Sequence, residues 1–174
     1  MPVYDANSAQ CFVYTFKEGL LSRFGHDLKL RFARFRLERP ESDAGDISAE
    51  FFLDSLEVLS ARREGRDDPT ALSARDKADI AKRMKGVLQP DRYPTASFQG
   101  RAQATGPDTW SIDGALQWRG REQRLVLHAR KTQNAIGVEG RFDQRLFGIE
   151  PYRAPLGALK LQAEVEVEVV VPLS

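Results

Sequence analysis

The sequence is poor in cysteine, in histidine and in long apolar runs. Its 174 residues include one cysteine, Cys11, and two histidines, His26 and His128. A single thiol excludes an intrachain disulfide and a thiolate-rich metal site, and two imidazoles are too few for a histidine-rich one. No apolar run approaches the ~20 residues that a membrane-spanning helix needs. We therefore expect no integral membrane segment, no bound metal and no cofactor.

The chain also lacks an excess of charge of one sign. Lys and Arg number 26 and Asp and Glu number 25, which leaves a formal net charge of +1. A dedicated nucleic-acid-binding protein usually carries a large basic excess, so the balance argues against that partner. The glycine-rich phosphate loops GxxxxGK[ST] and GxGxxG and the nucleophile elbow GxSxG are absent. We predict that the protein is not an enzyme.

The N-terminus, MPVYDANSAQ, has no basic leader and no apolar run, and it carries a carboxylate at Asp5. It does not resemble a secretory signal, so we expect a cytoplasmic protein. Hydrophobic residues make up 41% of the chain and charged residues 29%, which is typical of a globular protein. At this length we predict one domain, residues 1–174.

Most of the chain alternates between apolar and polar residues with a period of two, the pattern of half-buried strands. From residue 159 to residue 169 every second residue is apolar, and those between are lysine, glutamine or glutamate. Phe12, Tyr14 and Phe16 share one face of a first strand. The phase slips near Ala33, where a bulge would keep the apolar residues on both sides of it facing inward. The pattern predicts a mainly β fold of roughly eight antiparallel strands, which would form either a closed barrel or a sandwich.

One segment breaks this pattern with a helical period, and we predict an α-helical insertion over about residues 73–86. Ser73 followed by Asp76 is typical of a capping box, and Gly86 suits a C-terminal cap. Before the helix, the charged segment ARREGRDDP at 61–69 predicts a solvated loop.

His26 stands beside Asp27, and a histidine next to a carboxylate can act as a general base. The same pair fits a turn histidine that closes one end of a barrel. An eight-stranded barrel is just wide enough to be packed solid or to hold one slender ligand. Three hypotheses therefore stay open: a carrier of an apolar ligand, a small enzyme with its site near His26 and Asp27, and a solid-cored interaction module that pairs through an exposed strand or through residues 61–69. A homodimer is compatible with each of them.

Several short motifs, in the right order along the chain, resemble those of a known family. They are GHDL at 25–28, YPTASF at 93–98, GAL at 114–116 with Gly120 and the strand 124–127, and FDQRLFGI at 142–149. Together they make the chain resemble the YceI-like family. Members of that family adopt a lipocalin-like antiparallel barrel and bind polyisoprenoid or similar lipids. The resemblance implies an eight-stranded antiparallel barrel of the lipocalin type, with the helical insertion at about residues 73–86, and a long apolar ligand.

The inward apolar side chains of such a barrel would form a tunnel for the ligand, with polar groups at its mouth. The residues expected to line it are Phe16, Leu30, Phe32, Phe51, Phe98, Ile112, Leu116, Trp118, Leu127, Phe142, Phe147 and Val165. Ile80 and Met84 are expected to cover one end from the helix, and His26 and Arg145 to meet a polar head group. At ~0.8 kcal/mol per buried CH₂, a few isoprene units supply about 10 kcal/mol before the costs of binding. The predicted function is non-enzymatic binding or carriage of a polyisoprenoid or similar lipid.

Overall fold

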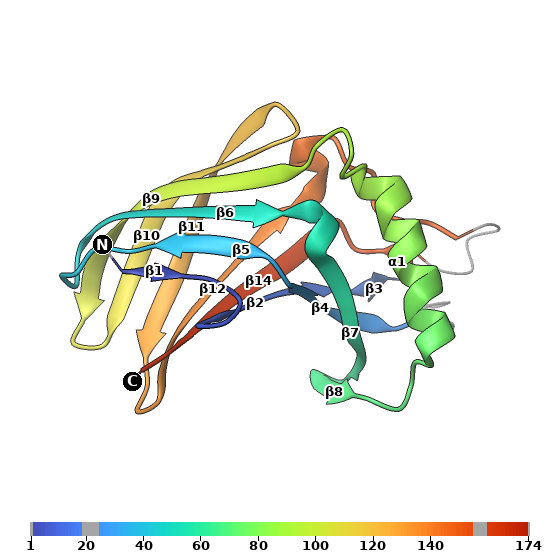
Figure 1. Cartoon of the computed structure of the whole chain (residues 1–174), viewed down its shortest axis with the longest axis horizontal. Helices are drawn as coiled ribbons and strands as arrows, with labels where there is room; N and C mark the ends of the chain where they lie inside the picture. Colours follow the sequence, from blue (N-terminus) through green and yellow to red (C-terminus); the bar gives the residue numbers. More distant parts are fainter. Residues whose placement is uncertain (1, 19–24, 155–159, 174) are drawn as a thin grey trace.

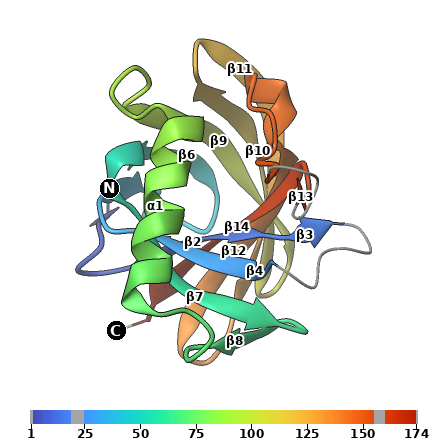
Figure 2. The same cartoon turned by 90° about the vertical axis from the view of Figure 1, so that its right-hand side faces the viewer.

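The computed structural model describes residues 2–18, 25–154 and 160–173. Twelve strands form one curled antiparallel sheet in the order β1-β5-β6-β9-β10-β11-β12-β14-β2-β4-β7-β8 (Figure 1). β3 pairs with β13 in a second, two-stranded sheet (Figure 2). The elements are β1 (Val3–Tyr4), β2 (Gln10–Thr15), β3 (Lys17–Glu18), β4 (Asp27–Phe32), β5 (Phe35–Glu38), β6 (Gly45–Phe52), the 3₁₀ turn η2 (Leu53–Ser55), β7 (Leu56–Arg63), β8 (Arg66–Asp68), α1 (Ala74–Leu88), β9 (Thr95–Gly106), β10 (Thr109–Trp118), β11 (Arg121–Lys131), β12 (Ala135–Asp143), the 3₁₀ turn η3 (Gln144–Phe147), β13 (Lys160–Leu161) and β14 (Glu164–Pro172).

Two long strands of the sheet are bent, and this accounts for two of the four strands by which the twelve-stranded sheet exceeds the predicted eight. β4 continues into β5 across Ala33 and Arg34, and β6 continues into β7 across η2. β4 pairs with β7, whereas β5 pairs with β6. Ser55 joins the two bends, because its hydroxyl accepts the Arg34 N–H at 3.0 Å and donates to the Phe52 carbonyl at 2.7 Å. The short strands β1 and β8 account for the rest of the difference.

The bend at Ala33 takes the place of the predicted bulge and has the predicted effect. Leu30 and Phe32 before it, and Phe35 and Leu37 after it, all face the inside of the barrel. The chain turns a corner there without exposing its apolar residues, so the mainly β, barrel-like prediction is confirmed in outline.

Phe12 and Tyr14 of β2 share one face, as predicted, and this is the outer face of the sheet. The odd-numbered residues of β2 line the interior, and successive residues of a strand point to opposite faces. Phe12 and Tyr14 are nevertheless only 7% and 6% exposed. Lys29 Nζ lies 4.3 Å from the centroid of the Phe12 ring, and the Arg62 guanidinium lies 4.5 Å from that of Tyr14. The two cations cover rings that would otherwise meet water.

Residues 61–69 form a hairpin rather than the predicted loop. β7 and β8 pair across the two-residue turn Glu64–Gly65, whose positive φ values of 51° and 77° suit a tight hairpin. The Asp67 carboxylate makes ion pairs with Lys29 and Arg62, each at 3.2 Å. The charges that suggest a solvated loop thus bind the hairpin to its own sheet.

α1 crosses one end of the barrel, on the opposite side from both chain termini. Figure 2 shows it running in front of the curled sheet. It begins with the predicted capping box: Ser73 Oγ accepts the Asp76 N–H at 3.1 Å, and the Asp76 carboxylate accepts the Ser73 N–H at 2.9 Å. It ends two residues beyond the predicted Gly86, because Gln89 adopts the left-handed conformation instead (φ 50°) and Pro90 cannot continue a helix.

The capping box leads to a prediction that depends on pH. Ser73→Ala should lower the free energy of unfolding by about 1 kcal/mol near neutral pH. Hydrogen bonds from Ser73 hold the pKa of the Asp76 carboxyl below its ordinary value. The pKa of the Asp76 carboxyl is lower in the folded state than in the unfolded state. The stabilisation from the ionised carboxylate is therefore present above about pH 4 and is lost as the pH falls through the folded pKa. Thermal unfolding followed by circular dichroism should show Asp76→Asn converging with the wild type in acid, and a difference that stays constant with pH would contradict this.

Candidate functional site

The barrel contains an elongated, mainly apolar cavity of about 630 Å³. This volume falls within the usual range for small-molecule sites, ~300–1,000 Å³. The lining follows β10 from Trp110 to Trp118. At ~3.4 Å per residue that distance is about 27 Å, whereas a sphere of the same volume would be only about 11 Å across. The cavity is therefore long and narrow.

Most of the residues that the sequence predicts at the ligand lie on this cavity. Those that line it are Leu30, Phe32, Phe51, Ile80, Met84, Phe98, Ile112, Leu116, Trp118, Leu127, Phe142, Val165 and His26. Where a strand contributes several residues, they occupy alternate positions, as expected for side chains on the inner face of a curled sheet. Contact with a ligand stays a prediction for each of them.

Two predicted aromatic residues do not line the cavity. Phe16 is half-buried between β2 and β3, where its carbonyl accepts the Gln162 N–H at 2.8 Å. Phe147 is 1% exposed and packs behind the wall, with its ring centroid 5.7 Å from that of Trp118 and 5.6 Å from that of Phe142. Phe147 thus supports two lining residues from behind.

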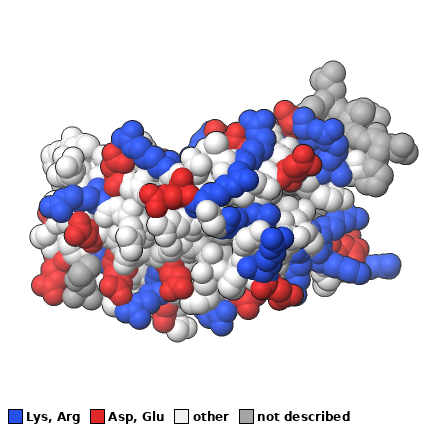
Figure 3. All heavy atoms as spheres, turned by 90° about the horizontal axis from the view of Figure 1, so that it is seen from above, with Lys and Arg blue, Asp and Glu red and all other residues white. Residues whose placement is uncertain are grey.

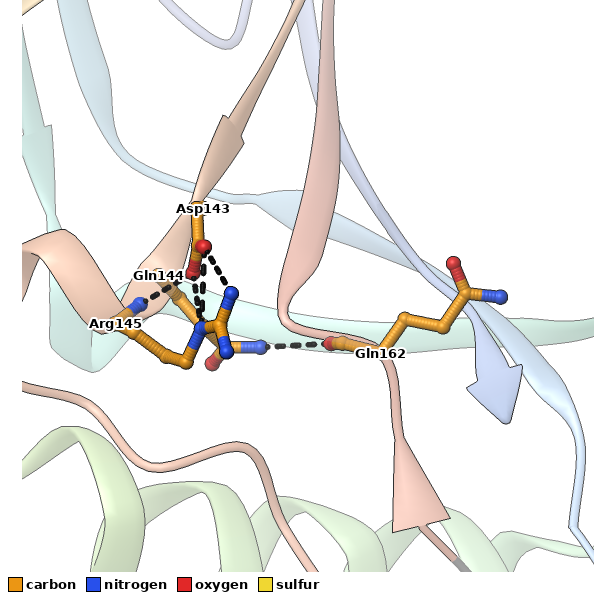
Figure 4. A network of polar contacts seen from close by, with 4 residues as sticks. All are labelled: Asp143, Gln144, Arg145 and Gln162. Atoms are coloured by element: carbon orange, nitrogen blue, oxygen red, sulfur yellow. Dashed lines mark hydrogen bonds and ion pairs between the residues drawn. The ribbon is translucent and has the colours of Figure 1, made fainter. Parts of the chain in front are cut away.

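Arg145, a predicted contact of the head group, does not line the cavity either and is bound to Asp143 (Figure 4). Its Nη2 donates to Oδ2 at 2.6 Å and its Nε to Oδ1 at 3.0 Å. These bonds lower the pKa of the Asp143 carboxyl and raise that of the guanidinium. Asp143 Oδ1 also accepts the backbone N–H of Arg145 at 2.9 Å, and the Gln144 amide donates to the Gln162 carbonyl at 3.1 Å. The FDQRLFGI motif therefore builds the 3₁₀ turn η3 at the rim of the barrel.

The end of the cavity beneath α1 is polar. His26 lines it, as predicted, together with Asp76, Asp79 and Arg83 of the helix. The three helix residues were not among the predicted site residues, although the sequence holds a signal for two of them. Asp76, Ile80 and Arg83 are spaced by four and three residues, which places them on one face of a helix.

The opposite end of the cavity is also polar. It is reached by the connection between β5 and β6, which contributes Arg39, Pro40, Ser42 and Asp43 to the lining. Arg39 Nε donates to the Tyr4 hydroxyl at 3.1 Å. The lining therefore passes from polar residues at one end, through apolar strand residues, to polar residues at the other.

Two side chains that could in principle be reactive, the Cys11 thiol and the Asp27 carboxylate, have structural roles. Burial, with a smaller contribution from Glu168, raises the pKa of the Cys11 thiol to about 12, so this thiol is a neutral, apolar part of the wall near pH 7. The carboxylate of Asp27, the partner proposed for His26 in the enzyme hypothesis, accepts the Lys17 N–H at 2.8 Å. That bond fixes the start of β4 beside β3.

Neither a cluster of metal-binding side chains nor a membrane-spanning helix is present among residues 2–18, 25–154 and 160–173. In these ranges no three His, Cys, Asp or Glu side chains are grouped so that they could hold a metal ion. The helical part of the same ranges is too short and too polar to cross a membrane.

Comparisons with known proteins agree with this architecture. The crystal structure of BcnA from Burkholderia cenocepacia aligns with a TM-score of 0.68 and 13% identity, over 98% of this chain and 99% of that one. The Campylobacter jejuni YCEI protein aligns with a TM-score of 0.56 and 13% identity, over 84% of this chain and 85% of that one. None of the curated proteins matches the sequence. The YceI-like domain matches residues 13–173, which is nearly the whole length, and the chain therefore belongs to the YceI-like family.

Proposed function

We propose that the protein binds or carries a long apolar ligand, a polyisoprenoid or similar lipid, inside the barrel. The observation that carries this proposal is the shape of the interior: the wall side chains leave about 630 Å³ unfilled along a narrow path. Membership of the YceI-like family supports it, because this is in general a family of binding proteins.

An apolar cavity of this form binds by removing hydrocarbon from water. Each buried CH₂ contributes ~0.8 kcal/mol, so ten such groups supply about 8 kcal/mol, which is partly offset by the loss of freedom on association. Such binding needs no set of catalytic or ion-binding side chains. It needs walls like those of β9 and β10, where Ala96, Phe98, Ile112 and Leu116 face the cavity.

A polar end group of the ligand is proposed to lie beside His26 and Arg83. Both residues line the cavity beneath α1. Arg145 is a poorer candidate because its guanidinium already pairs with Asp143 at 2.6 Å.

The other two hypotheses receive less support. A solid-cored interaction module requires an interior filled by its own side chains, and the unfilled cavity argues against it. An enzyme at His26 and Asp27 requires that the carboxylate orient the imidazole. Asp27 instead accepts the backbone N–H of Lys17.

Native mass spectrometry tests the proposed function. Protein purified from cells should carry one lipid per chain, lose it on extraction with organic solvent and take up one added polyprenol molecule in its place. A short alcohol of the same head group is the control, because it buries too few CH₂ groups to stay bound. If the purified protein carries no lipid and the extracted protein takes up no polyprenol, the proposal is wrong.

A further inference from the structure

We propose that the outer face of α1 docks the protein on an anionic lipid bilayer and so places the mouth of the cavity against the membrane. This inference rests on the proposed function, since it names the place where an apolar ligand would enter or leave. It concerns a different surface from the cavity itself, and the experiment below separates the two.

The charges of α1 are divided between two faces. Both of its carboxylates, Asp76 and Asp79, line the cavity and so face the barrel. Arg75, Lys82 and Lys85 are exposed and do not line the cavity. At 3.6 residues per turn these three cations fall on the side of the helix that points away from the barrel. The rest of that side consists of alanine and glycine, so its charge is entirely positive.

Two of these cations have no partner to neutralise them. Lys82 and Lys85 make no ion pair within residues 2–18, 25–154 and 160–173. Several cations of the strands are neutralised by a partner: Arg124, for example, is paired with Asp113 at 2.6 Å. Figure 3 shows blue side chains projecting at the end of the molecule where α1 lies. A basic helix face of this kind is complementary to an anionic membrane surface.

α1 lies directly over the mouth of the cavity. None of its fifteen residues is buried. Ile80 and Met84 point into the cavity, and Val87 and Leu88 at the C-terminal end of the helix pack against the core. A bilayer on the outer face would therefore be separated from the cavity by the thickness of this one helix.

Sedimentation with lipid vesicles tests the docking surface. The wild type should bind vesicles of phosphatidylglycerol mixed with phosphatidylcholine, should not bind phosphatidylcholine alone, and should be released by salt. Each Lys or Arg near an anionic leaflet is worth about fivefold in partitioning. The double variant Lys82→Glu/Lys85→Glu should therefore bind at least about 25-fold more weakly.

The matched control is Arg130→Glu/Lys131→Glu, which makes the same change of net charge at the end of β11 remote from α1. Both side chains are exposed, and this variant should bind the vesicles like the wild type. An equal loss in the two variants would show that only net charge matters and would overturn the proposal. So would a wild type that ignores anionic vesicles, or one that binds a DNA duplex as well as it binds them.

Uptake of polyprenol without vesicles separates this inference from the proposed function. All three proteins should take up the lipid equally, because neither double variant alters a residue that lines the cavity. Uptake that is lost in the α1 variant alone would place the two lysines in ligand binding and would overturn the docking role. If no protein takes up polyprenol but vesicle binding follows the α1 charges, the proposed function fails and the docking surface stands.

Discussion

Gly114→Ala is expected to lower the free energy of unfolding by about 2–3 kcal/mol. A Cβ atom at this position would overlap the Gln99 carbonyl oxygen and would lie 2.5 Å from Phe98 Cζ and 2.7 Å from the Gly100 Cα. Two of these neighbours belong to the backbone of β9, which pairs with β10 at Gly114 and Gly100. The neighbours cannot withdraw without disturbing the hydrogen bonds of the sheet, so the strain stays in the folded state.

Gly137→Ala is the matched control for this prediction. It lies in β12 with no heavy atom within 4 Å of the added Cβ, and alanine is favoured over glycine in a strand by roughly 0.5–1 kcal/mol. Urea unfolding followed by tryptophan fluorescence should show a lower midpoint for Gly114→Ala and an unchanged or slightly higher one for Gly137→Ala. Equal midpoints for the two variants would contradict the close approach of β9 and β10.

The glycines also help to keep the interior open. Phe98 leans over both Gly100 and Gly114, and a Cβ on either would come within 2.8 Å of its ring. The ring can lie along the wall only because these positions carry no side chain. Larger residues there would push it toward the centre of the cavity.

Val138→Trp is expected to weaken the binding of a polyprenol roughly 50-fold, if the ligand occupies the cavity. Val138 is half-buried and lines the interior. An indole that takes the place of about three CH₂ groups of the ligand removes ~2.4 kcal/mol of burial, and 1.4 kcal/mol corresponds to tenfold in affinity. Competition for a fluorescent fatty alcohol measures the change.

Glu139→Trp provides the comparison for this second prediction. Glu139 follows Val138 in β12 and is exposed on the other face, so its replacement should leave the affinity within about twofold, since it buries no ligand surface. The two variants have the same tryptophan content, and thermal unfolding checks that both are folded. Equal loss of affinity in both, or in neither, would place the ligand outside this cavity.

Much of the fold follows from the alternation of apolar residues, but not the choice of face in every strand. In β14 the outward residues are mostly glutamates, so Val165 and Val167 are correctly predicted to face inward. In β2 both faces are apolar, and the larger aromatic side chains lie outside. Alternation with a period of two shows that the two faces of a strand differ, but it does not show which face packs against the core. Lys29 and Arg62, which cover the outer rings, come from other strands and could not be predicted from local pattern.

The candidate site, like the fold, could be predicted only in part from the sequence. The strand positions that line the cavity could be predicted, because inward residues of a barrel share one phase. The unfilled volume could not, since it depends on how side chains such as Phe98 pack in space. The environment of Arg145 could be predicted only in part. Asp143 is two residues away in the sequence, but nothing in the sequence shows that its carboxylate accepts hydrogen bonds from both the guanidinium and the backbone N–H of Arg145.

The corners at Ala33–Arg34 and at η2 determine how the circumference of the barrel is closed. In the described part of the chain the sheet runs from β1 to β8 without a ladder between those two strands, so the ring is completed by peptide linkages at the corners. If the barrel holds an apolar guest, the girth available to it is thus set by the backbone angles at two short corners and by the hydrogen bonds between them.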